Sequence, residues 1–253
     1  SAATVQALSG FRAASFTQIA GSVATTFGGQ LDLTGAFDFT GQALNLNFVG
    51  ANTVGGTMDV TNAGLFTTAN GANLTVNNEF VQDGAGLVQL GGNLASTNDG
   101  FSFATGVTLN NGITISTGLG AGDDIFFNST LDGTQTLGLT AGDGTITFTG
   151  AVGTTRLGAV TVNSAATVQA LSGFRAASFT QNAGSVVTTF GGLLDLSGAF
   201  GFTGSALTIN GSGLNEVGGT MTVVNAGQFT TLDDANLTVG AFSQTGGGVN
   251  LLG

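Results

Sequence analysis

The sequence lacks proline, cysteine, histidine, tryptophan, tyrosine and lysine altogether. Without cysteine, the chain can form no disulfide, no thiolate metal site and no cysteine nucleophile. Without histidine it has no side chain that ordinarily changes charge near neutral pH, and without lysine it has no Schiff-base amine. Because so many catalytic mechanisms need one of these groups, we expect that the protein is not an enzyme and holds no cofactor, with calcium as the one ion considered below.

Positive charge is nearly absent as well. Only Arg12, Arg156 and Arg175 are basic, against 14 acidic residues, and the net charge is −11. Proteins that bind nucleic acid neutralise its phosphates with Lys and Arg, so we expect no nucleic-acid partner. Charged residues make up 7% of the chain and the mean hydropathy is +0.38, which is unlike the composition of disordered chains. No apolar run approaches the roughly 18 residues of a membrane helix, so we expect no membrane insertion.

What the sequence does contain is a long internal repeat. The block SAATVQALSGFRAASFTQ occurs twice, 163 positions apart, and residues 1–76 match residues 164–239 at 58 of 76 positions. We therefore divide the chain into a first unit, 1–163, and a partial second copy, 164–253, with no independent domain boundary between them. We expect the chain to be part of a longer array, in which duplication adds length.

A shorter period runs inside each unit. Large apolar residues recur every 21 or 22 residues in the first unit, at Phe16, Phe37, Met58, Phe80 and Phe101. The second copy repeats the series as Phe179, Phe200, Met221 and Phe242. Phe126 and Phe148 keep roughly the same step, whereas the interval from Phe148 to Phe179 does not. A period of this length is typical of a solenoid with one coil per repeat.

Short alternating segments predict strands within each coil. LDL at 31–33, FDF at 37–39 and TITFT at 145–149 alternate apolar with polar residues, which is the period of a half-buried strand. Gly, Asn, Asp and Thr between such segments supply turns. The sequence thus predicts an all-β protein, a parallel β-helix (β-solenoid) with coils of about 21–22 residues. The alternative is an antiparallel β-sandwich, in which 107–116 and 139–148 form hairpins around Asn-Gly and Asp-Gly turns.

The stretch that most resembles a binding site is GLGAGDDIFF at 118–127. Its Gly-x-Gly-x-Gly-Asp-Asp order is similar to half of a calcium-binding nonapeptide repeat. Asp123 and Asp124 are therefore candidate calcium ligands, and the other interpretation is a polar turn at a coil corner. Polysaccharide hydrolases built as β-helices also carry Gly-Asp-Asp, with carboxylates as acid and base. Those enzymes also use histidine and basic residues in the cleft, whereas this chain has no histidine and no lysine.

Two weaker features concern the surface. Arg12 and Arg175 occupy equivalent positions in the repeated block, where each either lies free in solvent or pairs with a carboxylate of an adjacent coil or a neighbouring chain. Threonine pairs suggest an ice-binding face, but they are not spaced one coil apart, and threonine is in any case a good outward-facing strand residue. These pairs are Thr25-Thr26, Thr67-Thr68, Thr188-Thr189 and Thr230-Thr231.

The segment LTAGDGTITFTGAVGTTRLGAVTVNSAAT at 139–167 resembles a phrase of large secreted bacterial repeat proteins. These are proteins of the filamentous-haemagglutinin and autotransporter-passenger type, which repeat the phrase in variants. The likeness of composition covers the whole chain, which is rich in Gly, Asn, Thr and Val and free of Cys. The resemblance implies a right-handed parallel β-helix, secretion by a bacterium, and a location outside the cell or on its surface.

These features lead us to expect a structural component of an extracellular bacterial filament, sheath or adhesin stalk, built as a self-stacking rod. Its expected partners are further copies of itself, in a homo-oligomer or fibre, because low charge and the absence of proline leave strands and apolar surface free to associate. The alternative is an adhesin shaft that contacts glycans or surfaces without assembling. Ice binding and a polysaccharide-active β-helix rank behind both.

Overall fold

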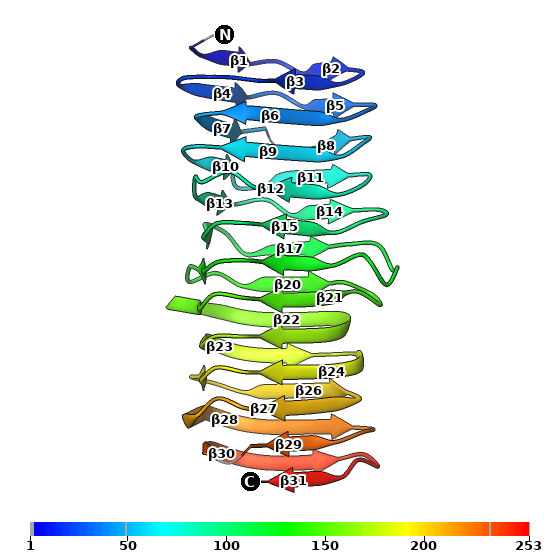
Figure 1. The fold of residues 1–253 in the computed structure, drawn as a ribbon, viewed down its shortest axis with the longest axis vertical. Coiled ribbons are helices and arrows are strands. Elements are labelled where there is room, and N and C mark those ends of the chain that lie inside the picture. The colour runs from blue at the N-terminus through cyan, green and yellow to red at the C-terminus, as the bar shows by residue number, and fades with distance from the viewer. Residues whose placement is uncertain (1–2, 49, 233, 253) are drawn as a thin grey trace.

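The protein is described from a computed structural model, which covers residues 3–48, 50–232 and 234–252. These residues form 31 β-strands and no helix, and the paired strands run parallel. The chain winds into about 12 coils stacked along one axis, so that its two ends lie at opposite ends of a rod (Figure 1). This architecture confirms the predicted parallel β-helix.

Each coil has three faces, because successive strands on one face are three apart in the chain. Face 1 contains β1 (Val5–Ala7), β4 (Ala24–Phe27), β7 (Ala43–Leu46), β10 (Phe66–Thr68), β13 (Val88–Leu90), β16 (Val107–Leu109) and β19 (Leu131–Asp132). Face 2 contains β2 (Phe11–Ala13), β5 (Leu31–Leu33), β8 (Gly50–Val54), β11 (Ala72–Val76), β14 (Leu94–Ser96), β17 (Ile113–Ser116) and β20 (Leu137–Thr140). Face 3 contains β3 (Phe16–Gln18), β6 (Phe37–Gly41), β9 (Met58–Asn62), β12 (Phe80–Gln82), β15 (Phe101–Phe103), β18 (Ile125–Phe127) and β21 (Thr145–Phe148).

Further along the chain, several strands continue around the corners. β22 (Val152–Ala170) pairs with β19, β20 and β21 in turn, so it covers all three faces of one coil and crosses from residue 163 to residue 164 without a break. β23 (Phe174–Gln181) covers faces 1 and 2, and β24 (Gly184–Phe190) covers face 3. The remaining coils contain β25 (Leu194–Leu196), β26 (Phe200–Gly204), β27 (Ala206–Ile209), β28 (Gly213–Asn225), β29 (Phe229–Thr231), β30 (Ala235–Thr245) and β31 (Asn250–Leu252).

The alternation in the sequence places one row of side chains inside the rod. In β5, Leu31 and Leu33 are buried and the side chain between them points outward, and most strands repeat this pattern. Like side chains then stack on like in adjacent coils. The rings of Phe103, Phe127 and Phe148 are nearly parallel, with successive centroids 5.4 and 5.3 Å apart. Such aromatic pairs contribute about 0.5–1.5 kcal/mol each beyond the hydrophobic effect of their buried area. Because each ring stacks on the next, the core is continuous from coil to coil.

The predicted 21-residue period corresponds to one ladder of side chains on face 3. Its members stand in register in successive coils, at Phe16, Phe37, Met58, Phe80 and Phe101. Phe126 keeps roughly the same step in the sequence but is not in this ladder: Ile125 takes that position, and Phe126 points outward beside Ser102. Phe148 is inside the rod, but it belongs to another row of side chains on face 3, in which its register neighbour is Phe127. The phase of the pleat, and not the size of the side chain, selects which residue is buried.

The two hairpins of the β-sandwich alternative do not form. β16 and β17 flank the Asn-Gly turn at residues 111–112, yet β16 pairs with β13 and β19, and β17 pairs with β14 and β20. β20 and β21 likewise flank Asp143-Gly144 and pair only with strands of neighbouring coils. Each turn directs the chain from one face to the next, because every strand finds its partner one coil away instead of across the turn.

Buried amide side chains satisfy backbone groups near the corners. Asn52 is only 1% exposed, and its Oδ1 accepts a hydrogen bond from Leu31 N at 2.8 Å. Its Nδ2 donates to Gly50 O at 2.9 Å and to Asn73 O at 3.0 Å. Asn215, the equivalent residue of the second copy, is also buried; its Oδ1 accepts a hydrogen bond from Leu194 N, and its Nδ2 donates one to Gly211 O. Such partners are needed because a buried backbone group without a hydrogen bond is costly.

Candidate functional site

The candidate calcium ligands lie on the loop between β17 and β18. Asp123 is buried, and its Oδ2 accepts a hydrogen bond from Gly120 N at 2.8 Å, while its carbonyl oxygen accepts one from Thr117 Oγ1 at 2.8 Å. Asp124 Oδ1 accepts from Thr145 N of the next coil at 2.5 Å. The first carboxylate therefore closes its own loop, and the second attaches that loop to the neighbouring coil.

This arrangement uses both carboxylates to hold the backbone. Within the described residues, no three His, Cys, Asp or Glu side chains are grouped so that they could hold a metal ion. Calcium takes about six to eight oxygen ligands, of which Asp123 and Asp124 would supply only a part. The hydrogen bonds fit a polar corner turn, and calcium binding by these two residues stays a prediction.

All three arginines form ion pairs within the rod. Arg12 Nε lies 2.8 Å from Asp32 Oδ2, and Arg175 Nε lies 2.9 Å from Asp195 Oδ2. Each pair joins register neighbours in adjacent coils, which confirms the interpretation that these arginines pair with the next coil. Arg156, for which the sequence suggested no role, donates to both carboxylate oxygens of Asp195, at 2.7 and 2.8 Å.

Arg156 reaches across an intervening coil to make this contact. It lies in β22, and it also donates to Ala176 O in the next coil at 3.1 Å and to Asp195 O in the coil after that at 2.8 Å. Partial burial raises the pKa of Asp195, but the hydrogen bonds from Arg156 and Arg175 outweigh it and hold the pKa below its ordinary value. We call these contacts of Arg156 with Ala176 and Asp195 the Arg156 clamp. The 39 residues between Arg156 and Asp195, which are almost two coils, are the sequence signal that could have revealed it.

Replacing Arg156 with alanine is expected to lower the free energy of unfolding by about 1–2 kcal/mol, because charge-assisted hydrogen bonds to partly buried groups are lost. Both side chains of the pair are about two-thirds covered, with 30% and 33% exposed. Arg12→Ala is the matched control, since its side chain is 83% exposed, and we expect its stability to equal that of the parent. Urea unfolding followed by circular dichroism measures both; equal effects of the two variants would contradict a special role for the clamp.

Acidic side chains are gathered on face 3 of the first copy. Asp38 and Asp59 are register neighbours in β6 and β9. Partial burial, followed by repulsion from Asp38 and Asp83, raises the pKa of Asp59. Partial burial also raises the pKa of Glu79, with added repulsion from Asp99 and Asp59. These carboxylates repel one another when charged, so they weaken the folded state near neutral pH.

Asp59→Thr, which introduces the residue found at the equivalent position 222, is expected to raise the melting temperature at pH 7 by about 1–3 °C. The folded-state pKa values of Asp59 and Glu79 are raised, so the folded chain binds protons more readily than the unfolded one. Stability should therefore increase as the pH falls from 7 towards about 5, and less so in the variant. The opposite contribution of Asp195 is lost only at lower pH, because its pKa is lowered. Melting curves from pH 7 to about pH 5, taken at low protein concentration, test the sign of this effect. A parent protein whose melting temperature rises no more than that of the variant as the pH falls would contradict it.

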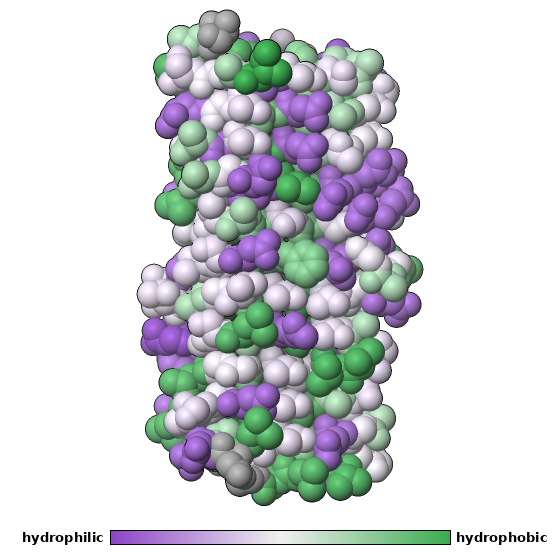
Figure 2. Space-filling view, viewed as in Figure 1, coloured by the Kyte–Doolittle hydropathy of each residue, from purple (hydrophilic) through white to green (hydrophobic). Residues whose placement is uncertain are grey.

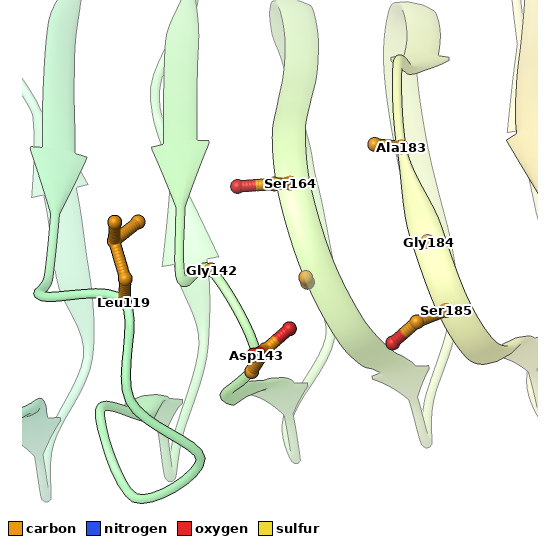
Figure 3. A pocket seen from close by; sticks show the side chains of 8 residues that line it. Leu119, Gly142, Asp143, Ser164, Ala183, Gly184 and Ser185 are labelled. Atoms are coloured by element: carbon orange, nitrogen blue, oxygen red, sulfur yellow. The ribbon is translucent and has the colours of Figure 1, made fainter.

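Shallow grooves follow the corners of the rod. One of about 490 Å³ lies where four successive coils turn from face 2 to face 3. Figure 3 shows that its polar side chains, Asp143, Ser164 and Ser185, come from three different strands or turns, and Leu119 stands on the loop at its edge. The lining of this groove thus includes one carboxylate and two hydroxyls, and no basic side chain.

The threonine pairs do not form a flat outward array. Thr25 and Thr188 are buried, and their hydroxyls donate to Gln18 Oε1 at 2.7 Å and to Gln181 Oε1 at 2.6 Å. Thr68 is buried as well. Because these members of the pairs point into the rod, only part of the predicted threonine set lies on the surface.

Comparisons with protein-family models, with curated proteins and with solved structures found no match. The fold therefore defines the class on its own: the chain is a parallel β-solenoid with three strands to a coil. In the part of the chain that the structure describes, no helix is long and apolar enough to cross a membrane. The resemblance to filamentous-haemagglutinin and autotransporter-passenger proteins stays a prediction.

Proposed function

We propose that the protein is a structural rod, a component of an extracellular bacterial filament, sheath or adhesin stalk whose copies associate with one another. The observation that carries this proposal is the parallel ladder that continues from one copy of the repeat into the next through β22 and β23. A further copy would add length through the same kind of contact. Stability in such a solenoid grows by the stacking of nearest neighbours, so duplication extends the rod without a new core.

Exposed apolar side chains support association between rods. In the second copy, leucines recur at the corner between faces 3 and 1 in successive coils and are between 44% and 60% exposed, at Leu171, Leu193, Leu214 and Leu232. Figure 2 shows apolar patches on one side of the rod, several of them in its lower half, among residues of intermediate hydropathy. Contiguous exposed apolar surface is typical of interaction sites, and a chain with 7% charged residues offers little repulsion between partners.

Electron microscopy of the purified chain tests this proposal, at pH 7 and again near the isoelectric point of about 4.1. We expect filaments or bundles whose fibre diffraction has a reflection at about 4.8 Å along the axis, and more of them at the lower pH, where repulsion is weakest. The same samples with added calcium or a chelator test Asp123 and Asp124. Short rods that stay monodisperse in every condition would contradict self-association and would favour the non-assembling adhesin shaft.

A further inference from the structure

The two copies of the repeat do not occupy the same faces of the rod. Phe16 lies on face 3, but its counterpart Phe179 lies on face 2, in register with Val160 of β22. Phe11 lies on face 2, and its counterpart Phe174 lies on face 1. Equivalent residues therefore lie one face earlier in the second copy: face 3 becomes face 2, and face 2 becomes face 1.

The number of strands in one unit explains this shift. Between β1 and its counterpart at the end of β22, the chain advances by 23 strand positions, made up of β2 to β21 and the three segments of β22. At three strands to a coil, 23 positions are seven complete coils and two-thirds of another. The ladder of large side chains that lies on face 3 in the first copy, from Phe16 to Phe101, therefore lies on face 2 in the second, from Phe179 to Phe242.

Surface features move with the fold. A groove of about 440 Å³, lined in part by Gly21, Thr40 and Asn62, lies at the corner between faces 3 and 1. Its counterpart of about 400 Å³, lined by the equivalent residues Gly184, Thr203 and Asn225, lies at the corner between faces 2 and 3. The ion pair between register neighbours moves as well, from face 2 to face 1.

We propose that tandem copies of this unit display the same surface on three sides of the rod in turn, each copy rotated by two-thirds of a turn from the one before. A feature returns to the same side with every third unit, after 23 coils or about 110 Å at 4.8 Å per coil. The partner that such a surface fits is a second rod of the same chain, because apolar side chains at equivalent positions are exposed in both copies: Leu8 with Leu171, and Val23 with Val186. Rods that meet through copies of one surface then contact neighbours on three sides, which builds bundles instead of flat ribbons. This consequence for association rests on the proposed function, whereas the rotation is a property of the single chain.

Cysteine pairs test the rotation directly, because the chain has no cysteine of its own. Register neighbours in adjacent coils lie about 4.8 Å apart, within the range that a disulfide can span. Thr147→Cys with Gln169→Cys on face 3, and Thr161→Cys with Thr180→Cys on face 2, join such neighbours. Thr147→Cys with Thr180→Cys would join neighbours only if the second copy continued the ladder on face 3.

We expect the first two pairs to cross-link almost completely under mild oxidation and the third to remain reduced. Circular dichroism before oxidation shows whether each variant is folded, and all four positions are partly exposed. Cross-linking of the third pair, or failure of the two register pairs in folded variants, would overturn the rotation.

Because the present chain holds fewer than two units, microscopy of rods made from three tandem copies of the unit separates this inference from the proposed function. Bundles with neighbours on three sides support both proposals together. Flat ribbons with the expected cross-links would overturn the three-sided contact and leave association standing. Rods that never associate but cross-link as expected would overturn the proposed function and leave the rotation of the single chain standing.

Discussion

Phe37→Ala is expected to lower the free energy of unfolding by about 3–5 kcal/mol, the usual cost of truncating a core phenylalanine. Phe37 is completely buried, and its ring stacks on that of Phe16 with 4.9 Å between centroids and meets that of Phe27 at 5.6 Å. The void cannot close easily, because the backbone ladders fix the distance between coils. Denaturant unfolding followed by circular dichroism measures the loss.

The repeat supplies matched controls for this experiment. Phe200→Ala, the equivalent change in the second copy, should cause a loss of similar size, because Phe200 is also buried and stacks on Phe179. Asp38→Gly changes the outward neighbour of Phe37 to the residue present at position 201, and we expect a much smaller effect. Hydrogen exchange should show that lost protection is concentrated in the coils next to the altered one. If Phe37→Ala costs no more than Asp38→Gly, the ladder on face 3 is not a main source of stability.

Gly86→Ala is expected to destabilise the rod by about 3 kcal/mol or more, because it forces two coils apart at a corner. A Cβ atom at position 86 would overlap the carbonyl oxygen of Gly64 and lie 2.6 Å from Asn62 Nδ2. That amide already donates to Gly64 O at 2.6 Å and accepts from Gln82 Nε2 at 2.8 Å. The overlap is with backbone and with a buried amide network, so no flexible side chain can move aside.

Gly122→Ala is the control for this substitution. A Cβ atom at position 122 would meet no other atom within 4 Å, and the backbone there does not adopt the left-handed conformation. We expect its melting temperature to match that of the parent. A Gly86→Ala variant that is as stable as Gly122→Ala would mean that close stacking at the corner of residues 84–86 is not required.

Much of the fold could be predicted because a solenoid repeats its contacts at a fixed sequence interval. Alternation in segments such as LDL at 31–33 indicated strands, and the 21-residue series beginning at Phe16 indicated that like side chains stack. The Arg12–Asp32 pair could be suggested for the same reason, since its partners are register neighbours about one coil apart. The clamp from Arg156 to Asp195 spans two coils at 39 residues and was not predicted.

The sequence by itself indicated that this chain is all-β, favoured parallel coils over an antiparallel sandwich, and showed that one unit of 163 residues begins again at residue 164. It did so because local alternation and a constant interval express contacts between equivalent residues. Only the tertiary structure decided that each coil has three faces, that Ile125 and not Phe126 continues the ladder, and that the second copy is turned onto other faces. The physical reason is that corners and loops, such as the one closed by Asp123, vary in length. The face on which a given strand lies therefore depends on the lengths of all the corners and loops before it, and no single segment of the sequence reveals it.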